Sequence, residues 1–172
     1  MKKTILFLLI TIFTNAQWSI STSERNALIS IYNQTDGANW SQKWDLEKDP
    51  YYWYGVKTSN GMVTELKLNG NLLKGNFPTS VFSLTNLKKL DLSSNKLYGE
   101  IPNLSSLSNL TYLNLSNNDF TGDVWSSYSN LPNLEEIYVG HNNCNISNTD
   151  FSGFSGLKSL DISKLNLTEI PA

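Results

Sequence analysis

A segment of 23 or 24 residues recurs along this chain, and this repeat limits the possible folds more strongly than any other feature. The copies that start at Val63, Leu87 and Leu110 align without gaps, and two more divergent copies start at Leu134 and Leu157. Self-similarity at a fixed period of this length is typical of a solenoid, in which each copy forms one coil and the coils stack. The predicted copies are residues 63–86, 87–109, 110–133, 134–156 and 157–172.

Each copy begins with apolar residues at its first, fourth and sixth positions, such as Leu87, Leu90 and Leu92. Because alternate side chains of a strand point to opposite faces, this spacing predicts a short strand, and stacking joins the strands into one parallel sheet. Four copies carry asparagine at the ninth position, where an amide can donate to and accept from backbone groups of neighbouring coils. These asparagines are Asn71, Asn95, Asn118 and Asn142.

The consensus of these copies, LxxLxLxxNxLxGxIP, resembles the leucine-rich repeat of plant receptor ectodomains and of some secreted bacterial proteins. The resemblance covers residues 63–172. It implies an α/β repeat solenoid, a right-handed coil with a parallel β-sheet on its concave face. It also implies a helical, tryptophan-rich cap before the first repeat.

Residues 17–62 fit such a cap. Ser21 and Glu24 form a capping-box pattern, which predicts the start of a helix whose apolar residues share one face. Bulky side chains further along would close the open end of the first coil; they are Trp40, Trp44 and Trp53.

The stretch YYWYGVKTS resembles the CxWxGVxC motif of plant-type caps, but Tyr51 and Thr58 occupy the two cysteine positions. This departure favours the disulfide-free bacterial relatives. The only cysteine, Cys144, cannot form an internal disulfide, so the fold must be held together by packing.

Residues 1–16 have the three-part layout of a secretory signal peptide, with two lysines, an apolar run and then small or polar residues. The run is too short to span a bilayer of ~30 Å, and no later segment has the length and apolarity of a transmembrane helix. We therefore expect a protein that is secreted, extracellular or exposed at the cell surface, with no transmembrane segment in the mature chain.

The formal charge of −2 and a pI near 5.3 argue against nucleic acid as a partner. Catalysis is not expected either. His141 is at an outward position of its copy whereas Cys144 is at a core position, so the two side chains should diverge, and a chain with one histidine offers no credible catalytic triad. No metal or other cofactor is expected. The alternating acids Asp45, Glu47 and Asp49 could bind calcium but lack the EF-hand pattern, which favours solvated cap charges.

The outward positions of the predicted strands form the candidate binding face. In the first two copies opposite charges should pair across the strands, Glu65 with Lys89 and Lys67 with Asp91. The next two copies lack obvious charge partners and carry tyrosines, which are favoured interface anchors but also stabilise cross-strand packing. The predicted ligand-binding residues are Tyr112, Asn114, Asn117, Glu136, Tyr138 and His141.

Three functions stay open at this point. The leading hypothesis is a binding module that recognises a protein or a glycan through the concave face. The alternatives are an inhibitor of an extracellular enzyme and a structural or surface-association protein.

The fifth copy departs from the pattern, because Leu165 stands where the other copies have asparagine. Terminal repeats normally need a polar cap, and Leu165 and Leu167 add apolar surface instead. A degenerate cap, a homodimer through the open face and missing C-terminal sequence all fit. We favour the last two.

Overall fold

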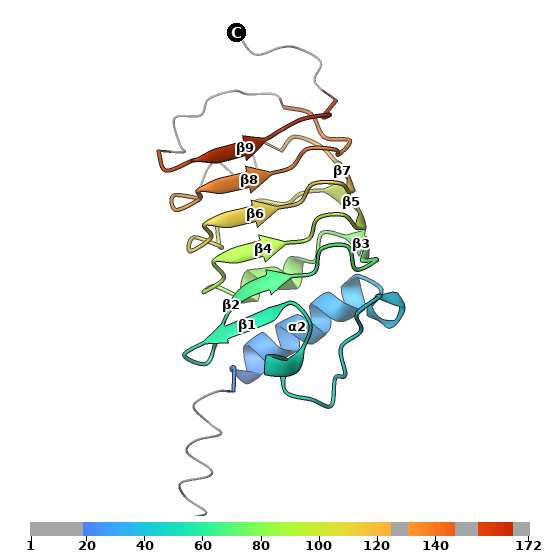
Figure 1. Ribbon diagram of the computed structural model, residues 1–172, viewed down its shortest axis with the longest axis vertical. Helices are drawn as coiled ribbons and strands as arrows, with labels where there is room; N and C mark the ends of the chain where they lie inside the picture. Colours follow the sequence, from blue (N-terminus) through green and yellow to red (C-terminus); the bar gives the residue numbers. More distant parts are fainter. Residues whose placement is uncertain (1–18, 125–130, 147–154, 167–172) are drawn as a thin grey trace, which may run out of the picture.

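The structure is a computed structural model, and it describes residues 19–124, 131–146 and 155–166. These residues form an elongated stack of coils with one α-helix at the N-terminal end (Figure 1). The predicted signal peptide, residues 1–16, lies outside the described residues.

Each predicted copy contributes one strand near its beginning to a six-stranded sheet with the order β1-β2-β4-β6-β8-β9. The strands from β2 to β9 run parallel, whereas β1 pairs antiparallel with β2. The predicted solenoid with a parallel sheet is thus confirmed, and β1 is an addition that the cap sequence did not indicate. The bounds are β1 Val56–Ser59, β2 Met62–Lys67, β4 Lys89–Asp91, β6 Tyr112–Asn114, β8 Glu136–Tyr138 and β9 Ser159–Asp161.

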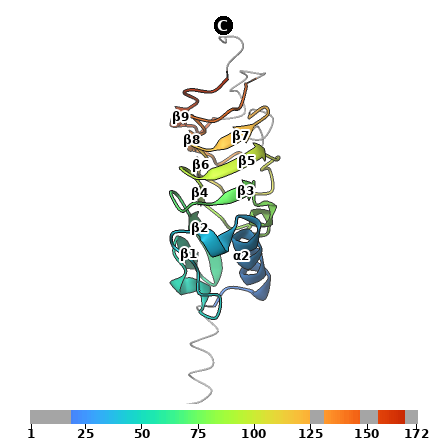
Figure 2. The same cartoon turned by 90° about the vertical axis from the view of Figure 1, so that its right-hand side faces the viewer.

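A second, three-stranded parallel sheet runs beside the first, as Figure 2 shows. Its strands are β3 (Lys74–Asn76), β5 (Lys96–Glu100) and β7 (Asp119–Thr121). They are short and largely exposed, so no hydrophobic period predicts them. A 3₁₀ helix, η3 (Thr79–Ser83), follows β3.

The asparagine ladder is confirmed. Asn95 Oδ1 accepts hydrogen bonds from the backbone N–H groups of Asn71 and Leu73 in the preceding coil, at 3.0 and 2.9 Å. Its Nδ2 donates to the carbonyls of Leu68 and Leu92, both at 2.9 Å. Because one amide serves backbone groups of two coils, it fixes their spacing as well as satisfying the turn.

The cap helix α2 (Thr22–Gln34) begins where the capping box predicts, because the N–H of Glu24 donates to Ser21 Oγ at 3.1 Å. The contacts of the Glu24 carboxylate differ from those of a capping box, in which it would accept from the backbone N–H of Ser21. It contacts Ser21 Oγ at 3.4 Å and accepts a hydrogen bond from the N–H of Val63 at 3.1 Å, so it joins the helix to the first repeat.

The three cap tryptophans are buried, as expected, and each indole N–H donates to a backbone carbonyl. Trp44 stacks on Trp53 with ring centroids 4.8 Å apart, and Trp40 meets Trp44 edge-on at 5.0 Å. Two short 3₁₀ helices, η1 (Gly37–Asn39) and η2 (Pro50–Tyr52), carry the chain through this region.

At the other end of the stack, β9 pairs with β8 and has no second strand partner among the described residues. Leu165 is buried in the asparagine position. Dimerisation through this end stays a prediction. In the part of the chain that the structure describes, no helix combines the length and apolarity needed to cross a membrane.

Candidate functional site

Four of the six predicted site residues lie together on β6 and β8. The register places Tyr112 beside Glu136 and Asn114 beside Tyr138. The two tyrosine rings are tilted by 46° with centroids 5.8 Å apart, and both side chains are half-buried. The tyrosines therefore form one aromatic patch in the middle of the parallel strands.

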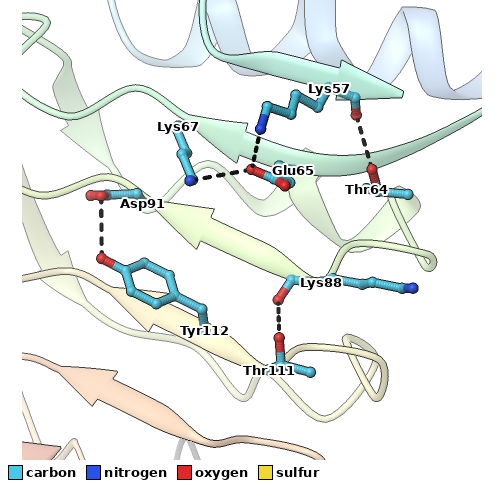
Figure 3. Close-up of polar contacts among 8 residues, drawn as sticks. All are labelled: Lys57, Thr64, Glu65, Lys67, Lys88, Asp91, Thr111 and Tyr112. Carbon is cyan, nitrogen blue, oxygen red and sulfur yellow. Dashed lines mark hydrogen bonds and ion pairs between the residues drawn. The ribbon is translucent and has the colours of Figure 1, made fainter. Parts of the chain in front are cut away.

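Hydrogen bonds to carboxylates hold both tyrosine hydroxyls. Tyr138 donates to Glu136 Oε2 at 2.9 Å. Tyr112 donates to Asp91 Oδ2 at 3.5 Å, and Figure 3 shows how these last two side chains lie. The Tyr112 hydroxyl also accepts from Asn114 Nδ2 at 3.3 Å. These contacts, which the sequence did not indicate, restrict the rings before any partner binds.

The surroundings of the Tyr112 hydroxyl raise its pKa. Burial is the largest cause, and the negative charge of Asp91 and Glu136 acts in the same direction, against the hydrogen bond from Asn114. Tyr112 thus stays a protonated donor at neutral pH, next to acidic groups.

The other two predicted residues, Asn117 and His141, are exposed and lie in the turn after the strands. Their φ angles of 54° and 56° put them in the left-handed region, together with Gly70, Ser94 and Lys164 at the same position of the other coils. Asn117 Nδ2 contacts Ser116 Oγ at 3.4 Å, and the backbone N–H of His141 donates to the Ser163 carbonyl at 2.8 Å. They therefore flank the tyrosine patch at the C-terminal ends of β6 and β8.

Sequence reasoning missed a second pattern on this face. Asn114 Oδ1 accepts from both the N–H and the hydroxyl of Ser116, at 3.0 and 2.7 Å. Asp91 binds Ser93 in the same way, at 3.0 and 2.6 Å. The triplets DLS, NLS and DIS in three copies are the signal that could have revealed these turns, since short acceptors bond to the backbone two residues on.

The fourth coil breaks this pattern, with Tyr138 and Gly140 where three other coils have an Asp or Asn and a serine. A Cβ on Gly140 would lie 2.8 Å from Asp161 Oδ1 and from Ser163 Oγ. The lack of a side chain at Gly140 therefore lets the Asp161 turn approach closely. Hydrogen bonds from the hydroxyl and the N–H of Ser163 lower the pKa of Asp161, and the charge of His141 also lowers it. Burial acts in the opposite direction but is outweighed.

At the other end of the sheet, the register places Glu65 beside Lys89 and Lys67 beside Asp91, as predicted, but neither pair forms an ion pair among the described residues. Glu65 instead forms ion pairs with Lys67 and Lys57 (Figure 3). Its Oε2 lies 3.2 Å from Lys67 Nζ and 3.4 Å from Lys57 Nζ. The reason is β1, whose antiparallel register puts Lys57 opposite Glu65. Burial alone would raise the pKa of Glu65, but the hydrogen bonds and charges of the two lysines outweigh it and lower the pKa.

Cys144 and His141 do not form a catalytic pair. Cys144 is fully buried, and its thiol donates to the Thr121 carbonyl at 3.6 Å, whereas His141 is exposed. Burial, with a smaller contribution from the charge of Asp123, raises the pKa of Cys144 to about 11. The divergence expected for these two side chains is confirmed.

Two acidic side chains of the cap, those of Asp45 and Asp49, accept hydrogen bonds from backbone N–H groups in turns. Asp45 Oδ1 accepts from the N–H of Glu47 at 3.2 Å, and Asp49 Oδ1 accepts from the N–H of Tyr51 at 2.8 Å. Among the described residues, no group of three or more His, Cys, Asp or Glu side chains is placed to hold a metal ion.

Two family models match the chain. One, described as "Leucine rich repeat", matches residues 108–167, and the other, "Leucine Rich repeats (2 copies)", matches residues 85–124. Together they span residues 85–167, from the second predicted copy into the fifth.

A probable inactive receptor kinase of Arabidopsis thaliana is 35% identical over 88 residues, which are 50% of this chain and 13% of the relative. The chain thus spans only a small part of the curated relatives it matches. The solved BIR2 ectodomain from Arabidopsis thaliana superimposes with a TM-score of 0.77 and 25% identity, over 88% of this chain and 84% of that one.

A second solved structure, of the plant peptide hormone receptor RGFR1 in complex with RGF2, superimposes with a TM-score of 0.62 and 31% identity. The match covers 70% of this chain and 19% of that chain. All three of these similar proteins are from plants, so the bacterial origin favoured by the missing cysteine pair stays a prediction.

Proposed function

Because the chain is a leucine-rich repeat protein, we propose that it is an extracellular recognition module that binds a protein or peptide on the outward face of its six-stranded sheet. Residues 1–16 support export, since their layout is that of a signal peptide. The likeness to a receptor described as binding a peptide hormone supports the class of partner.

The observation that carries this proposal is the tyrosine patch, Tyr112 and Tyr138, at 5.8 Å on neighbouring inner strands. Tyrosine rings offer large, rigid and half-polar surfaces, which are enriched among residues that dominate binding energy. Their hydroxyls are already held by Glu136 and Asp91, so little side-chain freedom remains to be lost on binding. We assign the contact surface to these tyrosines with Asn114, Glu136 and the flanking turn residues.

The test begins with the immobilised chain, exposed to extracellular and surface fractions, and with mass-spectrometric identification of what it retains. The affinity of the identified partner is then measured for the chain and for Tyr112→Ala/Tyr138→Ala. We expect binding to weaken at least tenfold in the double variant, about what losing one anchor residue costs. If the partner is an enzyme, its activity with and without the chain distinguishes an inhibitor from a simple binding module.

Tyr98→Ala is the matched control, because Tyr98 is an exposed tyrosine on β5, in the other sheet. It should leave the affinity within about twofold of the unchanged chain. Circular dichroism must show that all variants are folded. An unchanged affinity in a folded double variant would refute the placement of the site.

A further inference from the structure

The inner strands of the six-stranded sheet can recognise a partner through side chains alone. Strands β4, β6 and β8 each have a hydrogen-bonded neighbour on both sides. A peptide crossing them therefore finds no unpaired strand edge to extend, in contrast to recognition by strand addition. Specificity on this surface must come from the charges and rings that point outward.

The charges on this face are divided unevenly along the stack. On β1 and β2, Lys57 and Lys67 surround Glu65. On β8 and β9, the outward charges are Glu136 and Asp161, and neither makes an ion pair with any described residue. These two half-buried carboxylates thus have no cation at 4 Å or less among the described residues.

Three cationic or titratable groups border this acidic region. Lys89 is in register with Tyr112 on the side of β4, and His141 and Lys164 lie in the turns at the strand ends. The structure records no ion pair between them and Glu136 or Asp161. They frame the acidic region without neutralising it by direct contact.

The tyrosine patch lies directly against these carboxylates. Glu136 is in register with Tyr112 on one side and with Ser159 on the other, and its Oε2 accepts from the Tyr138 hydroxyl. The negative surroundings contribute to the raised pKa of Tyr112. A cation over this patch would meet ring faces and carboxylate oxygens together, which is the combination that stabilises a bound guanidinium.

We propose that this part of the face binds an arginine side chain of an extended peptide segment, held by the rings of Tyr112 and Tyr138 and the carboxylates of Glu136 and Asp161. The inference rests on the proposed function, since it names the partner chemistry of the same surface. Arginine fits better than lysine because its planar guanidinium stacks on rings and donates to two acceptors at once.

The probe is a display library of random peptides about seven residues long, enough when extended to cross five strands spaced ~4.8 Å apart. The folded chain is used as bait, and arginine should be enriched among the retained peptides. The best peptide is then synthesised with arginine and with citrulline, which keeps the shape and removes the charge. Citrulline should weaken binding at least tenfold, as expected for loss of a charge-assisted contact.

The carboxylates are tested with Glu136→Gln/Asp161→Asn, which should bind the arginine peptide about as weakly as the unchanged chain binds the citrulline peptide. In this variant the citrulline exchange should have little further effect, because the two changes remove the same interaction. The control variant is Glu135→Gln/Asp119→Asn, which makes the same change in net charge at an ion pair with Lys158 and on β7. Binding in the control should stay within about twofold.

The possible results distinguish failure of the arginine inference from failure of the proposed function. Peptides that lose affinity for Tyr112→Ala/Tyr138→Ala but not on citrulline exchange would overturn the arginine inference and leave the proposed function standing. Peptides that bind the tyrosine and carboxylate variants as well as the unchanged chain would overturn both. A library without any enriched peptide would count against both as well.

Discussion

The carboxylate of Glu24 accepts a hydrogen bond from the backbone N–H of Val63, 39 residues further along the chain, at 3.1 Å. Glu24 also lies in the first turn of α2, where its own N–H donates to the capping residue Ser21 at Oγ. Val63 is fully buried and lies in β2, the first strand of the repeats. One side chain therefore connects the start of the cap helix to the start of the solenoid.

Replacing Glu24 with alanine should destabilise the protein by about 2–3 kcal/mol, because a buried N–H is left without a partner. Glu24→Gln should lose less, since its amide oxygen can still accept. Urea unfolding followed by circular dichroism measures the difference. Glu47→Ala is the control, an exposed carboxylate of the same cap, and equal losses in Glu24→Ala and the control would show that the bond to Val63 contributes nothing.

Asn118→Ala should cost roughly 2–4 kcal/mol in free energy of unfolding, because several buried backbone groups lose their partner. The amide accepts from the N–H of Leu97 at 3.0 Å and donates to the carbonyls of Leu92 and Leu115 at 3.0 and 3.1 Å. The matched control is Asn109→Ala, at an exposed asparagine with one recorded bond, to the Thr85 carbonyl. It should cost less than about 1 kcal/mol. A loss for Asn118→Ala as small as this would contradict a structural role for the ladder.

The Glu65 ion pairs should make stability depend on pH in the acidic range. Because Lys67 and Lys57 lower the pKa of Glu65 in the folded state, its contribution is complete above the unfolded value and is lost as the pH falls through the folded value. Glu65→Gln should therefore be less stable than the unchanged protein at neutral pH, by ~1 kcal/mol at most. Urea unfolding at several pH values checks this. The difference should shrink on acidification, and a constant difference would refute the ion-pair explanation.

The thiol of Cys144 should react slowly in the folded protein. Its pKa of about 11 leaves almost no thiolate at neutral pH, and its side chain is fully buried. Because folding raises the pKa of Cys144, burial of the protonated thiol contributes fully to the stability of the protein below the pKa of an unfolded thiol. This contribution is lost as the pH rises towards 11. Labelling with Ellman's reagent, with and without guanidinium chloride, measures accessibility. Equal rates in both conditions would show that the thiol is not buried.

Much of the fold could be predicted because the same pattern of strand and turn residues recurs in several copies of the repeat. The apolar spacing located one strand per copy, and the asparagine column located the ladder. The second sheet could not be found in this way, since strands of three to five largely exposed residues leave no hydrophobic period. Strand β1 could not be predicted either, because it precedes the repeats and its pairing with β2 follows no repeated pattern.

The positions of the candidate residues on the sheet could be predicted, whereas their contacts could not. Outward positions follow from strand alternation, so Tyr112 and Tyr138 could be placed on neighbouring strands. Their hydroxyl partners depend on side-chain torsions, which a residue pattern does not contain. The left-handed turns at Asn117 and His141 had a weak signal in Gly70, at the same position of the first copy.

The sequence by itself determined the architecture, because a repeat of 23 or 24 residues with buried leucines can hide its apolar face only by stacking on its own copies. Only the tertiary structure decided the pairing of charges. Glu65 could face Lys89 across the sheet or Lys67 along its own strand, and the antiparallel strand β1 placed Lys57 on the same carboxylate. Such choices depend on distances of a few ångströms between segments that are not adjacent in sequence, and ion-pair energies change steeply over those distances.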